Sequence, residues 1–184
     1  YTACTRQYPN DYRGYNNLGM CQFIAGDYSA AKGNFNKAAN LAPDSKETTM
    51  NQALCDIIDG NYDSANQKLG NAGGVDGLNE ALGVYYMERG DYNAAVNAFG
   101  DAKSNNAALA QILTKDYSKA RNTLAAIAQP DATTYYLMAV LGARTNNQQM
   151  VTSNLSQAIS KDSSLRDKAA NDLEFSKFDI TSVL

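Results

Sequence analysis

Small and large apolar residues recur at fixed distances from a short phrase that appears four times along the chain. Each copy has a Gly or Lys, then an Asp or Asn, then a Tyr, with an Ala three residues after the Tyr. The copies begin at Gly26, Gly60, Gly90 and Lys115. Self-similarity at this period predicts a stack of repeated units rather than one globule with a unique layout.

The columns around each Tyr predict what one unit looks like. Nine residues before the Tyr, the copies carry Gly19, Ala53, Gly83 and Ala108; three residues after it, Ala31, Ala65, Ala95 and Ala120. Seven residues after it stand Phe35, Leu69, Phe99 and Leu124, and a fifth copy without the Tyr keeps Ala139, Val151, Leu155 and Ala158. These columns indicate paired α-helices that meet at small residues, with larger residues filling the space between layers.

The same positions resemble the tetratricopeptide repeat. Over 34 residues this repeat has an aromatic residue, then Leu-Gly, then Ala-x-x-x-Phe, and finally a Pro. Matches in the first and third copies are Tyr15, Leu18-Gly19, Ala31-x-x-x-Phe35 and Pro43, then Leu82-Gly83-x-x-Tyr86 and Ala95-x-x-x-Phe99. The chain departs from the family pattern in having no Trp, and in having Gln22 where the second aromatic is expected. The resemblance implies an all-α fold, an α-solenoid of stacked antiparallel helix pairs that forms a superhelix.

The repeats are irregular in length, because the spacing shortens from Tyr28 to Tyr62, to Tyr92 and to Tyr117. We expect a remnant second helix of a truncated repeat at 1–11, and five repeats at 12–45, 46–75, 76–104, 105–130 and 131–163. A C-terminal capping helix is expected at 164–178 and a tail at 179–184. The fourth repeat is predicted to have a short first helix, with Ser104 as its N-cap.

Both ends of the chain have predictable character. Tyr1 falls on the position of Phe35 one repeat earlier, so the chain opens within a second helix. We therefore expect a piece of a longer protein, whose bare half-repeat offers apolar surface for self-association. Near the other end, Leu165, Ala169 and Leu173 form one apolar stripe on an otherwise polar segment. This pattern is typical of a helix that caps a stack.

Composition and charge narrow the partners and the compartment. The formal net charge is −3 and no basic block is present, which argues against nucleic acid and anionic membrane surfaces as partners. No apolar run approaches the ~18 residues that span a bilayer, so direct membrane insertion is not expected. Abundant uncharged polar residues with modest charge favour a bacterial periplasm or cell envelope, with the cytoplasm as the alternative.

The residue types needed for catalysis or metal binding are scarce. The chain has no His, which removes the Ser-His-Asp triad, the Cys-His pair and histidine-based zinc sites. Cys21 and Cys55 share a column and are expected to be small buried residues, a disulfide between layers being the alternative. Asp56 and Asp59 are expected to be solvated. We therefore predict that the protein is not an enzyme and has no catalytic residue, metal site or cofactor.

The resemblance implies that the first helices of the repeats line a concave face, where extended peptides or partner helices bind. Exposed apolar residues mark interfaces, Asn amides can bond a peptide backbone, and Met adapts to irregular side chains. The predicted contact residues are Asn17, Met20, Phe23, Asn51, Leu54, Ile57, Val84 and Met87. The alternative is that part of this set is core.

One binding mode of the family is not expected here. Members that hold a C-terminal carboxylate do so with Lys and Arg from successive first helices, which supply charge-assisted donors. The candidate positions carry Asn16, Asn17, Asn51, Glu80 and Ala81, and only Arg13 is basic.

The sequence thus predicts a non-catalytic scaffold that binds a peptide or partner segment on its concave face, as part of a larger protein. The alternative is a structural spacer that orients neighbouring domains in a bacterial envelope protein and has no ligand of its own. A sensor of a small ligand between layers is a third hypothesis.

Overall fold

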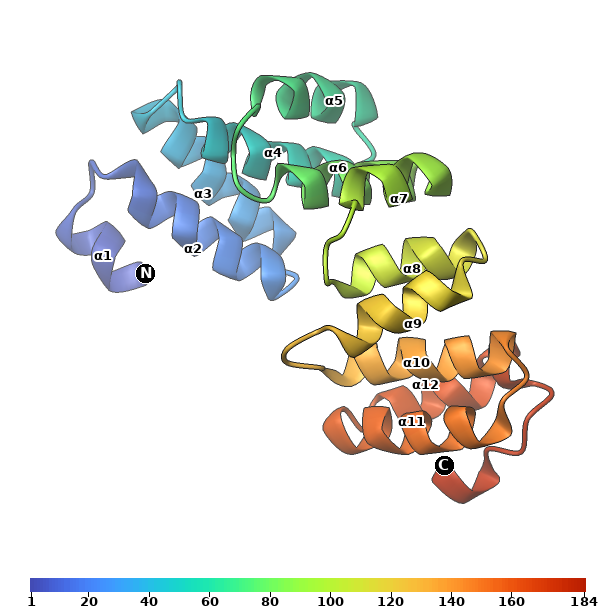
Figure 1. Ribbon diagram of the computed structural model, residues 1–184. Coiled ribbons are helices and arrows are strands. Elements are labelled where there is room, and N and C mark those ends of the chain that lie inside the picture. Colours follow the sequence, from blue (N-terminus) through green and yellow to red (C-terminus); the bar gives the residue numbers. More distant parts are fainter. The chain divides into compact units, whose positions relative to one another are not determined.

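The computed structural model describes residues 1–184 as helices joined by short loops, with no β-strand (Figure 1). Contacts divide the chain into two compact units, Tyr1–Gly90 and Asp91–Leu184, which are described separately. The first unit contains α1 (Thr2–Gln7), α2 (Tyr12–Ile24), α3 (Tyr28–Leu41), α4 (Lys46–Ile58), α5 (Tyr62–Asn71) and α6 (Leu78–Glu88). The second contains α7 (Tyr92–Phe99), α8 (Asn105–Leu113), α9 (Tyr117–Ala125), α10 (Ala132–Arg144), α11 (Gln148–Lys161), α12 (Leu165–Asn171) and the 3₁₀ turns η1 (Leu173–Phe175) and η2 (Thr181–Val183).

The repeated phrase forms the turn that ends one helix and begins the next. Gly26 has a φ of +82°, in the left-handed region that glycine adopts without steric cost. The Asp27 amide donates back to the Gln22 carbonyl at 2.9 Å, which closes a Schellman motif at the end of α2. The Asp27 carboxylate then accepts from the Ala30 amide at 3.1 Å and caps α3. Gly26 and Asp27 therefore each have a structural role in the turn.

Two copies of this turn keep the geometry without glycine. Lys115 and Asn146 adopt φ values of 65° and 54° at the position that Gly26 holds in the first turn. The Asp116 amide still donates to the Gln111 carbonyl, at 2.8 Å. This main-chain hydrogen bond therefore forms with or without a glycine at the turn.

Within the first helix pair, the small-residue columns mark the closest approach of α2 and α3. A Cβ built on Gly19 would lie 2.7 Å from the Phe35 ring, closer than real Cβ contacts. Ala31 and Phe35 are both fully buried. The Gly and Ala positions therefore bring the two helices together around a large apolar side chain, as the sequence predicts.

Polar contacts inside the helix pairs were not foreseen. Asn34 donates to the Gln22 side chain at 2.7 Å, between α2 and α3. In the next pair, the Asp56 carboxylate accepts from Ser64 at 2.7 Å and forms an ion pair with Lys68. Asp56 is only 7% exposed, so the expectation that it is solvated is wrong. Burial is tolerated because the carboxylate is paired and hydrogen-bonded.

The Tyr of the phrase joins successive layers in the first unit. The Tyr62 ring, at the start of α5, meets the Tyr85 ring of α6 edge-on at a centroid distance of 6.2 Å. An edge-to-face arrangement of this kind is a favourable aromatic geometry. The Tyr is thus placed to set how one helix pair packs on the next.

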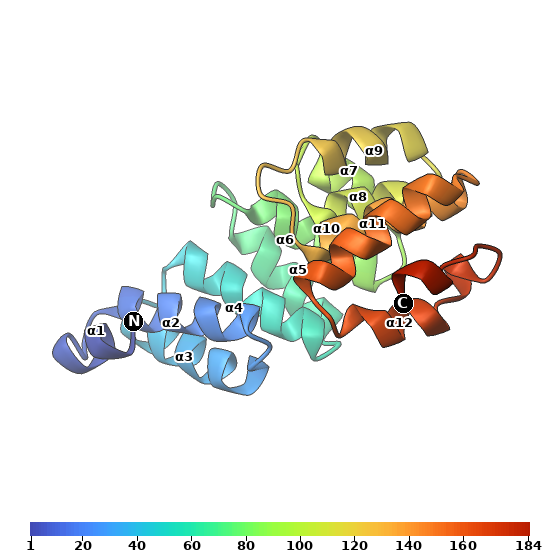
Figure 2. The same cartoon turned by 90° about the horizontal axis from the view of Figure 1, so that it is seen from below.

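The C-terminal segment closes the second unit. Phe175 of η1 is 1% exposed and meets the Tyr136 ring of α10 edge-on at 5.6 Å. The Tyr136 hydroxyl donates to Asp172 at 2.6 Å, and Arg144 forms a two-pronged ion pair with Glu174. Figure 2 shows α12 and the C-terminal turns beside α11. The end of the chain is therefore docked on the last helix pair.

The expected boundaries can be compared with the helices directly. The predicted repeats begin at residues 12, 46, 76, 105 and 131, and each of these positions lies at a helix start or in a loop. The short first helix of the fourth repeat is present as α8, and Ser104 caps it by accepting from the Ala107 amide. The capping helix expected at 164–178 is shorter, because α12 ends at Asn171 and a 3₁₀ turn follows.

Candidate functional site

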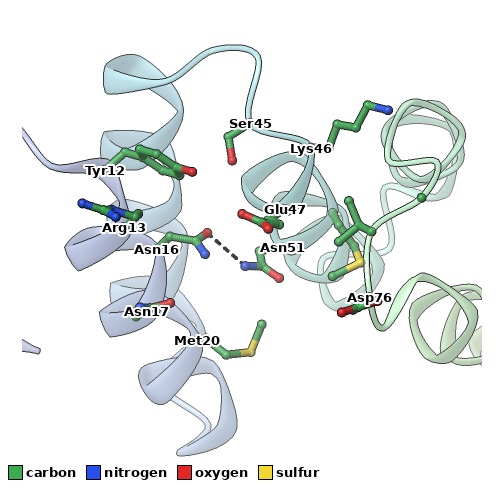
Figure 3. Close-up of a pocket in the computed structure, with 13 residues that line it drawn as sticks. Tyr12, Arg13, Asn16, Asn17, Met20, Ser45, Lys46, Glu47, Asn51 and Asp76 are labelled. Carbon is green, nitrogen blue, oxygen red and sulfur yellow. Dashed lines mark hydrogen bonds between the residues drawn. The ribbon is translucent and has the colours of Figure 1, made fainter.

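A groove with a volume of about 870 Å³ lies within the first unit (Figure 3). Three segments form its walls: α2, the beginning of α4 and the loop between α5 and α6. Its lining consists of Tyr12, Arg13, Asn16, Asn17, Met20, Ser45, Lys46, Glu47, Met50, Asn51, Gly74, Val75 and Asp76. Amide, charged and apolar side chains thus share one open surface.

Helical periodicity explains the α2 wall. Arg13, Asn16, Asn17 and Met20 follow one another at the spacing that puts side chains on one face of a helix. Asp11 begins this helix by accepting from the Arg13 amide at 3.0 Å. The N-cap therefore fixes the turn from which these side chains project.

The α4 wall is fixed in the same way. Ser45 caps α4 by accepting from the Thr48 amide at 3.3 Å. Glu47 and Met50 then lie on the face of the first two turns that borders the groove. Lys46 reaches the third wall, because its ammonium donates to the Gly73 carbonyl at 3.0 Å. This bond ties the start of α4 to the loop before α6.

Asn51 is the central polar residue of the groove. Its amide nitrogen donates to Asn16 at 3.0 Å and so links the two helical walls. Figure 3 shows this bond crossing from α2 to α4. Asn51 is only 4% exposed, and its Oδ1 has no hydrogen-bond partner in the protein. A buried acceptor without a donor is uncommon in native structures and calls for an explanation.

The charged pair at the edge of the groove titrates outside the neutral range. Hydrogen bonds from the Arg13 side chain and backbone lower the pKa of the Asp11 carboxyl. The same contact raises the pKa of the Arg13 guanidinium. Arg13 and Asp11 therefore remain charged and joined near neutral pH, with an Nη2–Oδ2 distance of 2.7 Å.

Residues 12–45, which contribute the α2 wall, match the family model of the tetratricopeptide repeat. This segment is therefore similar to one tetratricopeptide repeat. Repeats of this family generally form non-catalytic scaffolds for protein–protein interaction. A comparison with curated proteins gives no match.

Solved structures share the tetratricopeptide-repeat fold at low identity. A tetratricopeptide repeat protein from Parabacteroides merdae is similar with a TM-score of 0.68 and 14% identity, over 88% of this chain and 70% of that one. YrrB, a repeat protein described as having an unusual peptide-binding site, gives 0.52 and 17%, over 93% and 97% of the two chains. The Cut9–Hcn1 structure gives 0.50 and 15%, over 96% of this chain and 44% of that one. At these identities the likeness concerns the fold.

Three of the residues predicted for the concave face of the repeat stack come together in the groove. Asn17, Met20 and Asn51 all line it. Phe23 lies one turn beyond, where its half-buried ring meets Tyr28 edge-on. Of the predicted set, these three are therefore the ones that a ligand in the groove would contact.

The predicted residues of α4 and α6 beyond the groove lie against or in the core. Ile57 is 2% exposed, so its assignment to the binding surface is corrected. Leu54 and Val84 are half-buried and pack against the core cluster that contains Ile57. Met87 is half-buried and does not line the groove. Ile57, Leu54 and Val84 thus belong to or pack against the hydrophobic core, as the alternative interpretation of the columns allowed.

The sequence-based prediction did not include several residues that line the groove, although the repeat register could have indicated some of them. Lys46, Glu47 and Met50 stand one repeat length after Tyr12, Arg13 and Asn16, so repeat register alone pairs the two walls. The contribution of Val75 and Asp76 had no such signal. They lie in the loop before α6, where the repeat pattern is interrupted.

The other features singled out in the sequence lie outside the groove. All three cysteines are free, with Cys4 and Cys21 exposed and Cys55 buried. Cys21 is therefore not the buried residue that its column suggests. Burial raises the pKa of the Cys55 thiol to about 11, so this thiol is protonated at neutral pH. None of the helices is both long and apolar enough to span a bilayer.

Proposed function

We propose that the groove of the first unit binds an extended segment of a partner protein, and that the chain acts as a non-catalytic scaffold. The observation that carries this proposal is the buried Asn51 amide, whose Oδ1 lacks a donor although the residue lines an open groove of about 870 Å³. Oδ1 is covered in the unliganded chain, so we expect a ligand N–H group to satisfy this acceptor after a side-chain shift that opens it to the groove.

An extended peptide suits the polar part of the groove. Each peptide residue other than proline presents one N–H donor and one carbonyl acceptor on its backbone. The side-chain amides of Asn16, Asn17 and Asn51 both donate and accept, so they are matched to such a ligand. A buried acceptor left without a partner costs ~1–3 kcal/mol, which a bound N–H would recover in part.

The apolar part of the groove suits side chains of varied shape. Met20 and Met50 come from the two helical walls, and Val75 from the loop. Methionine is flexible and polarisable, so it adapts to irregular apolar groups. The description of YrrB as a peptide-binding protein supports this proposal at the level of the shared fold.

Blocking the groove tests the proposal. Peptides selected from a random phage-displayed library on the full chain are expected to lose binding to Asn17→Trp, because Asn17 is exposed in the groove and a large ring there occupies it. Met20→Glu, which adds charge to the apolar wall, is expected to act in the same direction. Fluorescence anisotropy of the selected peptides measures both effects.

A matched control lies on the same helix. Ile24 is 79% exposed and does not line the groove, so Ile24→Trp is expected to keep peptide affinity. Far-UV circular dichroism should show unchanged helicity for all three variants. Equal binding by wild type and Asn17→Trp would place the site elsewhere, and failure to select any peptide would favour the structural spacer.

A further inference from the structure

The positively and negatively charged side chains of the groove differ in whether they have partners within the protein. Its cations, Arg13 and Lys46, each have a partner: the Asp11 carboxylate and the Gly73 carbonyl. In Figure 3 both cationic groups point away from the space between α2 and α4. The groove therefore does not direct its positive charge toward a ligand that lies between the two helices.

The carboxylates of the groove are in the opposite situation. Glu47 and Asp76 are exposed and form no hydrogen bond or ion pair within the protein. Figure 3 places Glu47 between the two helical walls, beside Asn16 and Asn51, and Asp76 on the loop before α6. The negative charge that is free to meet a ligand thus lies beside Asn51, whose Oδ1 lacks a partner.

We propose that this groove selects an extended peptide segment that carries Lys or Arg side chains, in contrast to an acidic segment or a free C-terminal carboxylate. This inference rests on the proposed function, since it names the class of peptide for the same groove. The Asn amides would hold the backbone, while Glu47 and Asp76 would meet the cationic side chains.

Charge complementarity is the physical reason for this selectivity. Opposite charges a few ångströms apart near a protein surface attract, and like charges suppress the wrong partner. An acidic ligand would approach Glu47 and Asp76 without gaining an unengaged cation. It would therefore meet repulsion where a basic ligand meets attraction.

The experiment compares three synthetic peptide pools of equal length, rich in Lys and Arg, in Gln, or in Glu, by fluorescence anisotropy with the full chain at low salt. The basic pool is expected to bind most tightly. The double variant Glu47→Gln/Asp76→Asn is expected to weaken that binding by more than about 2-fold and by up to about 30-fold, the combined effect of two exposed charge contacts. Added salt should weaken wild-type binding more than binding by this variant.

A control variant removes the same formal charge elsewhere. Asp63→Asn/Asp167→Asn changes two exposed carboxylates that do not line the groove, and should leave the affinity for the basic pool within about twofold. The reversal Glu47→Lys/Asp76→Lys is expected to shift the preference to the acidic pool. Equal loss in the control and groove variants would mean that net charge, not the groove, attracts the peptide, and would overturn the inference.

The outcomes separate this inference from the proposed function. If neutral or acidic peptides bind as tightly as basic ones and Asn17→Trp abolishes that binding, the inference fails and the proposed function stands. If no pool responds to Asn17→Trp, both fail.

Discussion

Gly19 lies against the ring of Phe35 at a distance that leaves no room for a Cβ. Gly33 lies on the neighbouring helix α3, and apart from its chain neighbours and the backbone of its own helix no heavy atom lies within 4 Å of the place where a Cβ would stand. The two glycines are alike in the sequence and both are helical, but their surroundings differ. At the residue scale, the packing partner decides whether a glycine is needed.

Alanine at these two sites should therefore have opposite effects. Gly19→Ala is expected to destabilise the protein by ~1–3 kcal/mol, because the added methyl overpacks a fully buried ring. Gly33→Ala is expected to stabilise it by ~0.5–1 kcal/mol, because alanine restricts the unfolded chain and favours the helix. Urea unfolding followed by circular dichroism measures both. A Gly19→Ala variant as stable as Gly33→Ala would contradict the close packing of α2 on α3.

At the scale of the element, side-chain caps decide where several helices begin. Asp131 starts α10 with a capping box: its carboxylate accepts from the Thr134 amide at 2.8 Å, and its own amide donates to the Thr134 hydroxyl oxygen at 3.2 Å. Asn105 of α8 donates to the same carboxylate at 3.1 Å. The cap thus also contacts the preceding helix pair.

The Asp131 cap should give the stability a pH dependence. Burial acts to raise the pKa of this carboxyl, but the hydrogen bonds from Thr134 and Asn105 outweigh it and lower the pKa. Because the folded pKa lies below the unfolded value of ~3.9, the cap stabilises the fold above that pH, and the contribution is lost as pH falls through the folded pKa. Asp131→Ala is expected to cost ~1 kcal/mol near neutrality.

Urea unfolding of wild type and Asp131→Ala across acidic and neutral pH checks this prediction. The difference in unfolding free energy should shrink as the medium becomes more acidic than the unfolded pKa, since the wild-type carboxyl is then protonated as well. A difference that stays constant over the whole range would show that the charge of the cap contributes nothing.

At the scale of the whole molecule, the two ends of the chain are held very differently. The helix α1 contains no buried residue, and Tyr1 and Tyr8 are 59% and 57% exposed. The C-terminal segment instead buries Phe175 and Ile180, which are 1% and 9% exposed. A repeat stack needs its terminal apolar faces covered, and here the C-terminal segment covers one of them.

Truncation should reveal this difference between the ends. Removing residues 1–8 is expected to cost less than ~1 kcal/mol, because exposed surface substitutions and terminal losses have small effects. Removing residues 172–184 is expected to lower the free energy of unfolding by at least ~3–5 kcal/mol, the cost of truncating one buried Phe. The polar contacts of Tyr136 and Arg144 with this segment are lost as well. Thermal unfolding measures both, and an equal loss of stability would contradict the docking of the C-terminal segment.

The repeat columns in the sequence determined the all-α tetratricopeptide-repeat fold and its close helix pairs. Close packing of two helices, as at Gly19 and Ala31, requires small residues at a fixed spacing, and both can be read from the sequence. The phrase at Gly26 and Asp27 likewise determined where helices stop and start, since a Schellman turn and an N-cap are local structures. Their sequence signatures lie within a few residues of the structure they form.

The tertiary structure alone decided which inner side chains border the groove and which lie within the hydrophobic core. Asn51 and Ile57 lie in the same helix α4 and were both predicted to contact a partner, but only Asn51 lines the groove. The burial of Asp56 beside Ser64 and Lys68, and the contribution of Val75 to the groove, were likewise decided by how other elements pack. The exposure of a side chain depends on what packs over it, and this information is not contained in its own column.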